Sequence, residues 1–220
     1  MIKNVIFDWS GVVTNDIVPV HKAIMAMFRK FGVKEMSVEE FRREWEQPYM
    51  RFYQRYGMFA GPNQKKNEKE EVALYRSYLK AALSDHPIEC YPGMRNVLLG
   101  LWTKGINMIV VSSNLKETLE ADLDNFLLRG VFREINHGVH DKSKNIRKTV
   151  KRNKFISGET VFVGDTPHEI ESGKAARLKT CGVTWGFSSE EKLGAFNPDY
   201  IVHSPSELES LILAKKGEAY

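Results

Sequence analysis

The sequence predicts an α/β fold in which a parallel sheet is covered by helices on both faces and an all-helical segment is inserted near the start. Short apolar runs rich in β-branched residues alternate with amphipathic helical patterns along most of the chain. Each run ends at Gly, Asp, Ser or Asn, and this alternation predicts right-handed crossovers between parallel strands. Residues from about 16 to 90 break the alternation and show only helical patterns.

The parallel sheet is predicted from four apolar segments that are short enough for strands and bounded by turn residues. These strands are residues 5–7, 108–111, 161–163 and 180–183. Between and after them, apolar residues recur at the spacing of one helix face. The corresponding helices are predicted at residues 95–104, 115–128, 144–152 and 170–177.

The inserted segment is predicted to contain several helices. Ser37 followed three residues later by Glu40 forms the pattern of a capping box, which predicts a helix start at that point. The other helical or aromatic-rich stretches are residues 17–31, 49–56 and 68–83. Tyr91-Pro92-Gly93 then marks the return to the sheet. We therefore predict two domains, one formed by residues 1–14 and 91–220 and the other by residues 15–90.

Composition and charge limit the partners of the protein. The 220 residues carry a formal net charge of only +4, and basic residues are spread along the chain, which argues against nucleic-acid binding. Cys90 and Cys181 are too few for a disulfide framework, and we expect buried thiols. Trp45 and Trp102 are expected in the core. There is no signal-peptide pattern and no apolar run of membrane-spanning length, so we expect a cytoplasmic protein without membrane contacts.

Polar residues follow the predicted strands at the points where each strand ends. The carboxyl ends of parallel strands lie at one edge of the sheet, where ligands bind, so these residues are expected to lie close together. Asp8 and Gly11 follow the first strand. The other groups are Ser112-Ser113-Asn114, Lys142 or Lys144, and Asp165 with Glu169.

Together these residue types suit a phosphate site. A carboxylate such as Asp8 can attack phosphorus and form an aspartyl-phosphate. A hydroxyl and an ammonium can hold the transferring oxygens, while Asp165 and Glu169 can bind Mg²⁺. Each residue alone also has a structural explanation as a helix cap, a turn or a surface charge. The combination, one group after each strand, favours the functional interpretation.

The motifs resemble those of the haloacid dehalogenase-like hydrolase superfamily over essentially the whole chain. Phe-Asp-Trp-Ser-Gly-Val (7–12), Val-Val-Ser-Ser-Asn (110–114) and Val-Gly-Asp-Thr-Pro-His-Glu (163–169) resemble its nucleophile, hydroxyl and metal motifs. The resemblance implies a Rossmann-like core and a mobile helical cap formed by the insertion.

The resemblance also implies roles for single residues. Asp8 would be the nucleophile, and Mg²⁺ would be held by Asp8, the Ser10 carbonyl and Asp165, with Glu169 supporting the metal. Ser112 and Lys142 would hold the phosphoryl oxygens, Lys142 being preferred to Lys144. The remaining candidates for contacts with a small phosphorylated substrate are Gly11, Ser113, Asn114, His21 and Arg51.

Ser10 departs from the phosphatases of this superfamily, which usually have a second Asp there as general acid and base. A hydroxyl cannot supply that proton transfer near neutral pH. Three interpretations stay open. The protein could be a phosphatase that uses a substitute acid such as His21, or a substrate with a good leaving group. It could be a phosphonatase-type hydrolase, because the Asp-Trp-Ser-Gly motif of this chain resembles the motif of that group, or it could be a slow or inactive module that binds a phospho-ligand. The dehalogenases need no metal, so the Asp165/Glu169 pair argues against them. The phosphatase is favoured.

Overall fold

The computed structural model describes residues 1–214, apart from the side chain of Gln64, and divides the chain into two compact units. One comprises Met1–Asn15 and Glu89–Tyr220, and the other comprises Asp16–Ile88. The predicted core domain extends to residue 220, and its residues 215–220 lie outside the described part. We call the first the sheet unit and the second the helical unit, and describe each by itself.

The sheet unit contains a six-stranded sheet in the order β5-β4-β1-β6-β7-β8, and every neighbouring pair is parallel. The first strand in the chain therefore lies inside the sheet, between β4 and β6. The strands are β1 (Asn4–Phe7), β4 (Asn107–Val111), β5 (Glu134–Asn136), β6 (Thr160–Gly164), β7 (Lys179–Val183) and β8 (Tyr200–Val202). This confirms the predicted α/β, Rossmann-like fold.

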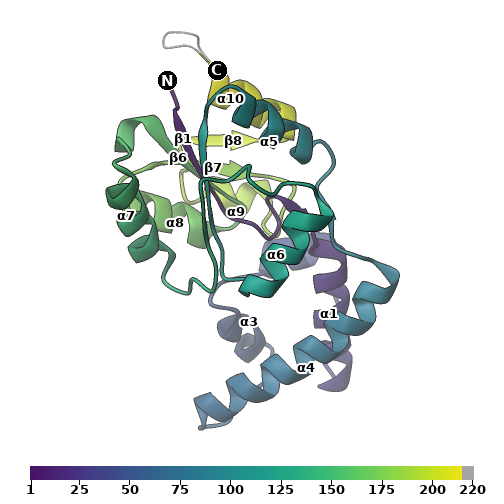
Figure 1. The fold of residues 1–220 in the computed structure, drawn as a ribbon. Helices are drawn as coiled ribbons and strands as arrows, with labels where there is room; N and C mark the ends of the chain where they lie inside the picture. Colours follow the sequence, from purple (N-terminus) through teal and green to yellow (C-terminus); the bar gives the residue numbers. More distant parts are fainter. Residues whose placement is uncertain (215–220) are drawn as a thin grey trace. The chain divides into compact units, whose positions relative to one another are not determined.

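Helices connect these strands. They are α5 (Met94–Thr103), α6 (Lys116–Asn125), α7 (Lys142–Asn153), α8 (Pro167–Ala175), α9 (Glu190–Gly194) and α10 (Pro205–Leu213), and a short 3-10 turn, η1 (Ser157–Glu159), precedes β6. From β1 the chain passes to β4 and then to the edge strand β5, returns to β6 on the other side of β1, and continues to β7 and β8. Because the crossovers between parallel strands are right-handed, α5 and α6 lie on one face of the sheet and α7 and α8 on the other. Figure 1 shows α7 beside α8, and α5 beside α10.

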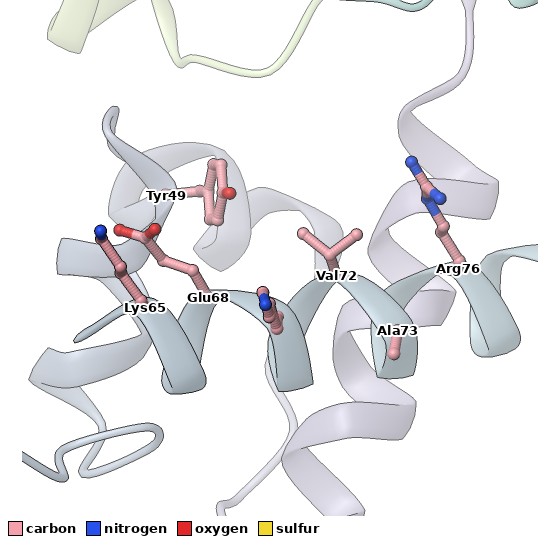
Figure 2. Close-up of a pocket in the computed structure, with 7 residues that line it drawn as sticks. Tyr49, Lys65, Glu68, Val72, Ala73 and Arg76 are labelled. Carbon is pink, nitrogen blue, oxygen red and sulfur yellow. The ribbon is translucent and has the colours of Figure 1, made fainter. Parts of the chain in front are cut away.

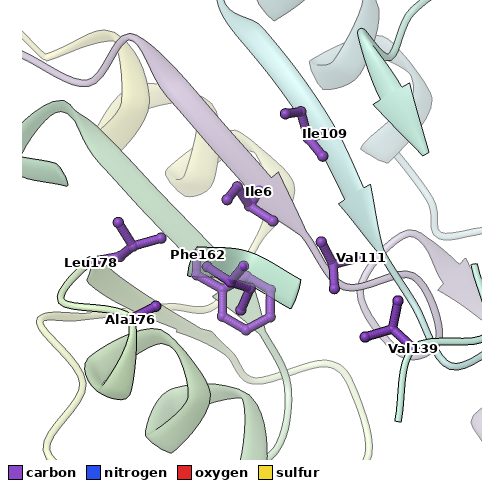
Figure 3. Close-up of a cluster of buried hydrophobic side chains, with 8 residues drawn as sticks. Ile6, Ile109, Val111, Val139, Phe162, Ala176 and Leu178 are labelled. Carbon is purple, nitrogen blue, oxygen red and sulfur yellow. The ribbon is translucent and has the colours of Figure 1, made fainter. Parts of the chain in front are cut away.

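Apolar side chains fill the space between the sheet and the helices α7 and α8. Figure 3 shows Ile6, Ile109 and Phe162 from three adjacent strands on this face. The cluster also contains Val111, Val139, Ile146, Ala176 and Leu178. The alternate residues of β1, including Val5 and Phe7, are fully buried as well, so this strand is covered on both sides. A covered central strand holds the residue that follows it in a fixed position.

Two expectations about single core residues have different outcomes. Trp45 is buried, as predicted, whereas Trp102 is 53% exposed near the end of α5 and the prediction of a core position was wrong. The helix buries the face that carries Val97, Leu98 and Leu101, and Trp102 lies on its other side. Cys181 is buried, as expected, whereas Cys90 is only half-buried, in β3 (Glu89–Cys90).

The helical unit contains α1 (Ile17–Lys30), α2 (Val38–Glu44), α3 (Tyr49–Arg55) and α4 (Gln64–Asp85). The Ser37 hydroxyl accepts from the Glu40 backbone N–H while the Glu40 carboxylate accepts from Ser37, which confirms the predicted capping box. The core is aromatic, with the ring of Phe52 in contact with Phe28, Phe41 and other rings.

Where the chain leaves and re-enters the sheet unit, β2 (Thr14–Asn15) pairs antiparallel with β3 (Glu89–Cys90). Among the described helices, none has the length and apolar character needed to span a membrane.

Candidate active site

The sheet brings Asp8 and Asp165 to the same edge. Asp8 follows β1 directly, and Asp165 follows β6, whose Val163 pairs with Phe7. The Asp8 backbone N–H donates to the Val163 carbonyl at 2.9 Å, so the pairing of the two strands continues to the site. Strand order reverses around β1, and such reversal points are where open parallel sheets bind ligands.

Lys142 joins this edge from the start of α7. Its Nζ lies 3.0 Å from Asp8 Oδ1 and 2.6 Å from Glu169 Oε1. Lys142 is buried, whereas Lys144 is exposed. The backbone N–H of Lys144 donates to the carboxylate of Asp141, the N-cap residue of the helix. Of the two lysines that the sequence offers, the structure therefore places Lys142 at Asp8.

Three buried carboxylates lie together at this edge, and Lys142 contacts two of them, Asp8 and Glu169. Each of Asp8, Asp165 and Glu169 offers an oxygen, and these atoms all lie within 4.8 Å of one another. Burial raises the pKa of Asp8 to about 6, although Lys142 opposes the shift. Burial and then the charges of Glu169 and Asp8 raise the pKa of Asp165 well above its ordinary value. The two aspartates are therefore hard to ionise together in this arrangement.

Glu169 and Lys142 form the shorter of the two ion pairs in the cluster. Burial alone would raise the pKa of Glu169, but it is lowered by the charge and the hydrogen bond of Lys142 and by the hydroxyl of Thr166, which also donates to Glu169. Burial alone would likewise lower the pKa of Lys142, yet Asp8 and Glu169 raise it above its ordinary value. Both Glu169 oxygens are thus occupied by protein donors.

The donor set fits a divalent cation. Three carboxylates lie close to one ammonium, and burial first, followed by the charge of neighbouring carboxylates, raises the pKa of Asp8 and of Asp165. A divalent cation would supply the missing positive charge, and ligands that are all oxygen suit Mg²⁺. Since Glu169 is held by Lys142 and Thr166, Asp8 and Asp165 are the carboxylates best placed to contact the ion.

Glycines and a backbone N–H shape the space around Asp165. A Cβ added to Gly11 or to Gly186 would lie 2.2 Å from Asp165 Oδ2, and Gly11 also has a φ of +73°. The Phe187 backbone N–H donates to the same oxygen at 2.6 Å. Sequence reasoning identified Gly11 and interpreted residues 185–187, after β7, as a structural loop near the site. It did not predict the contacts of Gly186 and Phe187 with Asp165, because these depend on the path of the loop. The glycine at 186 was the available signal.

The hydroxyl motif follows β4 on the same edge. Ser112 is 1% exposed, and its Oγ accepts from the Asn114 backbone N–H at 3.0 Å. Ser113 is exposed and Asn114 is half-buried. Ser10 is half-buried in the turn after Asp8. Ser112 and Ser10 thus lie in the strand-end loops of the site.

His21 and Arg51 belong to the helical unit. His21 lies 2.9 Å through its Nε2 from the Met36 carbonyl and packs edge-on against Phe41, so this nitrogen is already used within the unit. Arg51 is exposed on α3. The carboxylate cluster belongs to the sheet unit, so the proposed substrate contacts of His21 and Arg51 stay predictions.

A hollow of about 440 Å³ lies on the helical unit. Figure 2 shows Tyr49 of α3 above a row of α4 side chains. The lining residues are Tyr49, Lys65, Glu68, Lys69, Val72, Ala73 and Arg76. Three of these are cationic and one is acidic, so the hollow has a net positive charge, but it includes neither His21 nor Arg51.

Comparison with known proteins gives one consistent family. A family model described as haloacid dehalogenase-like hydrolase matches residues 5–183. A protein provisionally named pyrophosphatase PpaX from Clostridium perfringens is 29% identical over 96% of this chain and 98% of its own length. A phosphoglycolate phosphatase from Synechococcus elongatus is 28% identical over 55% of this chain and 58% of its own. The structure of a predicted phosphatase from Clostridium acetobutylicum shares the fold, with a TM-score of 0.77, 23% identity and coverage of 97% and 99% of the two chains.

Proposed function

Because the chain belongs to the haloacid dehalogenase-like hydrolase family, and is therefore an enzyme of that hydrolase class, we propose that it is a Mg²⁺-dependent phosphatase of small phosphorylated metabolites. The observation that carries this proposal is the contact of Lys142 with Asp8 inside the cluster of three buried carboxylates. The phosphatase and pyrophosphatase names of several relatives are consistent with it. The sheet unit would be the catalytic core, the helical unit the cap, and the cytoplasm the place of action.

Asp8 is the proposed nucleophile. Its carboxylate attacks phosphorus, the bond to the leaving oxygen breaks, and an aspartyl-phosphate forms that water then hydrolyses. Lys142 keeps a positive charge beside Asp8, which favours the ionised carboxylate and offsets the charge of the phosphoryl oxygens. Ser112 would donate its hydroxyl to one of those oxygens. Ser113 and Asn114, in the same loop, and Gly11 are proposed to border the phosphate.

The metal site would consist of Asp8, Asp165 and the Ser10 carbonyl, with Glu169 supporting it from its bonds to Lys142 and Thr166. Mg²⁺ bound there supplies positive charge that offsets the repulsion between an anionic substrate and an anionic nucleophile. Gly11 and Gly186 leave the room that Asp165 needs, since a side chain at either position would collide with it.

Ser10 determines which leaving groups are suitable. Its hydroxyl cannot protonate the departing oxygen at neutral pH, and the Nε2 of His21 is used by Met36. We therefore expect fast turnover only for phosphates whose leaving group is stable as an anion, such as phosphoanhydrides and aryl phosphates.

The proposal is tested by phosphate release from p-nitrophenyl phosphate with and without Mg²⁺, for the wild type and for Asp8→Asn. We expect release that needs Mg²⁺ and is abolished by the substitution. Phosphate release by Asp8→Asn at the wild-type rate would refute the role of Asp8. Absence of release by the wild type on aryl phosphates and phosphoanhydrides would refute the phosphatase function.

A further inference from the structure

Trp9 links the proposed nucleophile to the turn that follows it. Its backbone N–H donates to the Asp8 carboxylate. Its carbonyl accepts from the backbone N–H of Val13 at 2.9 Å and of Thr14 at 3.1 Å, which closes the turn that contains Ser10. Any movement of the Trp9 backbone would therefore change both the direction of the Asp8 carboxylate and the shape of this turn.

The Trp9 side chain is anchored on α6. It is fully buried, and its Nε1–H donates to Asp122 Oδ2 at 2.9 Å. The indole stacks on Phe126 with ring centroids 6.2 Å apart and meets Phe132 edge-on at 5.8 Å. The two rings fix the plane of the indole, while the hydrogen bond fixes its position within that plane.

Asp122 is an unusual residue for this place in the helix. It is 7% exposed, and burial raises the pKa of its carboxyl while the Trp9 hydrogen bond lowers it. Burying a carboxyl group is unfavourable unless a donor compensates for the lost water. Leu119 and Leu123, its buried neighbours on α6, show that an apolar residue would suit the surroundings. A carboxyl at position 122 therefore points to a need for a hydrogen-bond acceptor.

We propose that Asp122 is a positioning residue, whose hydrogen bond to the Trp9 indole holds the turn of residues 8–14 so that Asp8 and the Ser10 carbonyl keep their orientation. The inference rests on the proposed function, since it assigns the reaction to Asp8. Because α6 starts shortly after the Ser112 loop, the same hydrogen bond connects the loops that follow β1 and β4.

The kinetic test compares Asp122→Leu, which has no acceptor, with Asp122→Asn, whose amide oxygen can still accept from Trp9. For p-nitrophenyl phosphate we expect Asp122→Leu to lower kcat by about tenfold or more with little change in KM, because a misplaced nucleophile slows the chemical step. Asp122→Asn is expected to retain kcat within about twofold of the wild type. Asp124→Leu, at an exposed acid of the same helix, is the matched control.

A double-mutant cycle separates positioning from general damage. Trp9→Phe keeps a ring but loses the donor, so it should lower kcat much as Asp122→Leu does. The double variant Trp9→Phe/Asp122→Leu should be no slower than the slower single variant, because both changes remove the same hydrogen bond. Multiplicative losses would contradict the proposal. Urea unfolding of each variant verifies that the compared proteins are folded.

Amide hydrogen exchange provides a readout that does not depend on turnover. Asp122→Leu should speed exchange of the amides of Val13 and Thr14, which donate to the Trp9 carbonyl, whereas Asp122→Asn should not. Wild-type exchange and wild-type kcat in Asp122→Leu would overturn the proposal. If the wild type releases no phosphate, the proposed function fails, and the exchange measurement still decides whether Asp122 holds the turn.

Discussion

At the scale of single residues, Lys142 determines the electrostatics of the site. It contacts Asp8 and Glu169 at once, and all three are buried. Removing one member of a buried charge group leaves the others uncompensated. The identity of position 142 should therefore matter more than that of any lysine on the surface of α7.

Lys142→Met is predicted to lower phosphate release by about 10²-fold or more, because Asp8 loses the charge that keeps it ionised and the phosphoryl oxygens lose a cation. Lys144→Met should remain close to the wild type, since Lys144 is exposed. Steady-state rates of the two variants check this prediction. A larger loss at position 144 would contradict it.

Ser10→Asp is predicted to restore the missing proton transfer. For alkyl phosphates, whose leaving groups need protonation, kcat/KM should rise by about 10²-fold, while p-nitrophenyl phosphate should change little. The measurement is kcat/KM across a series of leaving groups, with Ser77→Asp at an exposed position of α4 as the control. Equal gains for all leaving groups would show that proton transfer is not what Ser10 lacks.

Sequence reasoning located the residues at the strand ends but not those that hold them. Asp8, Lys142 and Asp165 could be predicted to converge because parallel strands end at one edge. Their catalytic roles stay predictions. Thr166, Gly186 and Asp122 could not be foreseen in their contacts, because these depend on the paths of loops and on helix rotation, which a local pattern does not determine.

At the scale of elements, the buried inner strands of the sheet were predicted and the two short edge strands were missed. The strands β1, β4, β6 and β7 are almost entirely buried, which makes their sequences apolar. β5 and β8 lie at the edges of the sheet and are only three residues long, which is too short for a clear strand pattern, and β5 also contains Glu134 and Asn136. In the helical unit, α4 begins at Gln64, four residues before the predicted start.

The helical unit contains a buried acid on α4 that couples its stability to pH. Glu71 is 3% exposed, burial raises its pKa to about 7, and the Tyr53 hydroxyl donates to it. The folded state therefore holds its proton more tightly than the unfolded state does. Stability is lost as pH rises from about 4.5, the ordinary value, to about 7, and the full cost is present above pH 7.

Glu71→Gln is predicted to remove this pH dependence. The unfolding free energy of the variant minus that of the wild type should be about 1 kcal/mol larger at pH 8 than at pH 5, after allowance for solvent screening. Urea unfolding at both pH values measures the difference. The exposed neighbour Glu70, changed to Gln, is the matched control. If the unfolding free energies of Glu71→Gln and of the wild type differ by the same amount at pH 5 and at pH 8, Glu71 ionises normally in the fold.

At the scale of the whole molecule, metal binding should stabilise the fold, because the carboxylate cluster carries repulsion that a cation relieves. At Mg²⁺ concentrations of 10 to 100 times the Kd, we expect about 1.4 to 2.7 kcal/mol of added stability. Asp165→Asn should lose this gain, whereas Asp124→Asn should keep it. Thermal unfolding with Mg²⁺ and with a chelator checks the prediction, and an equal Mg²⁺ effect in both variants would place the ion elsewhere.

The most direct test of the central claim is detection of the aspartyl-phosphate. We would mix the enzyme with Mg²⁺ and p-nitrophenyl phosphate, quench within one turnover in acid, reduce the acyl-phosphate with borohydride and map the product by mass spectrometry. The proposed mechanism predicts a label on Asp8 that is absent from Asp8→Asn. Phosphate release without any adduct at Asp8, or a label on another residue, would contradict it.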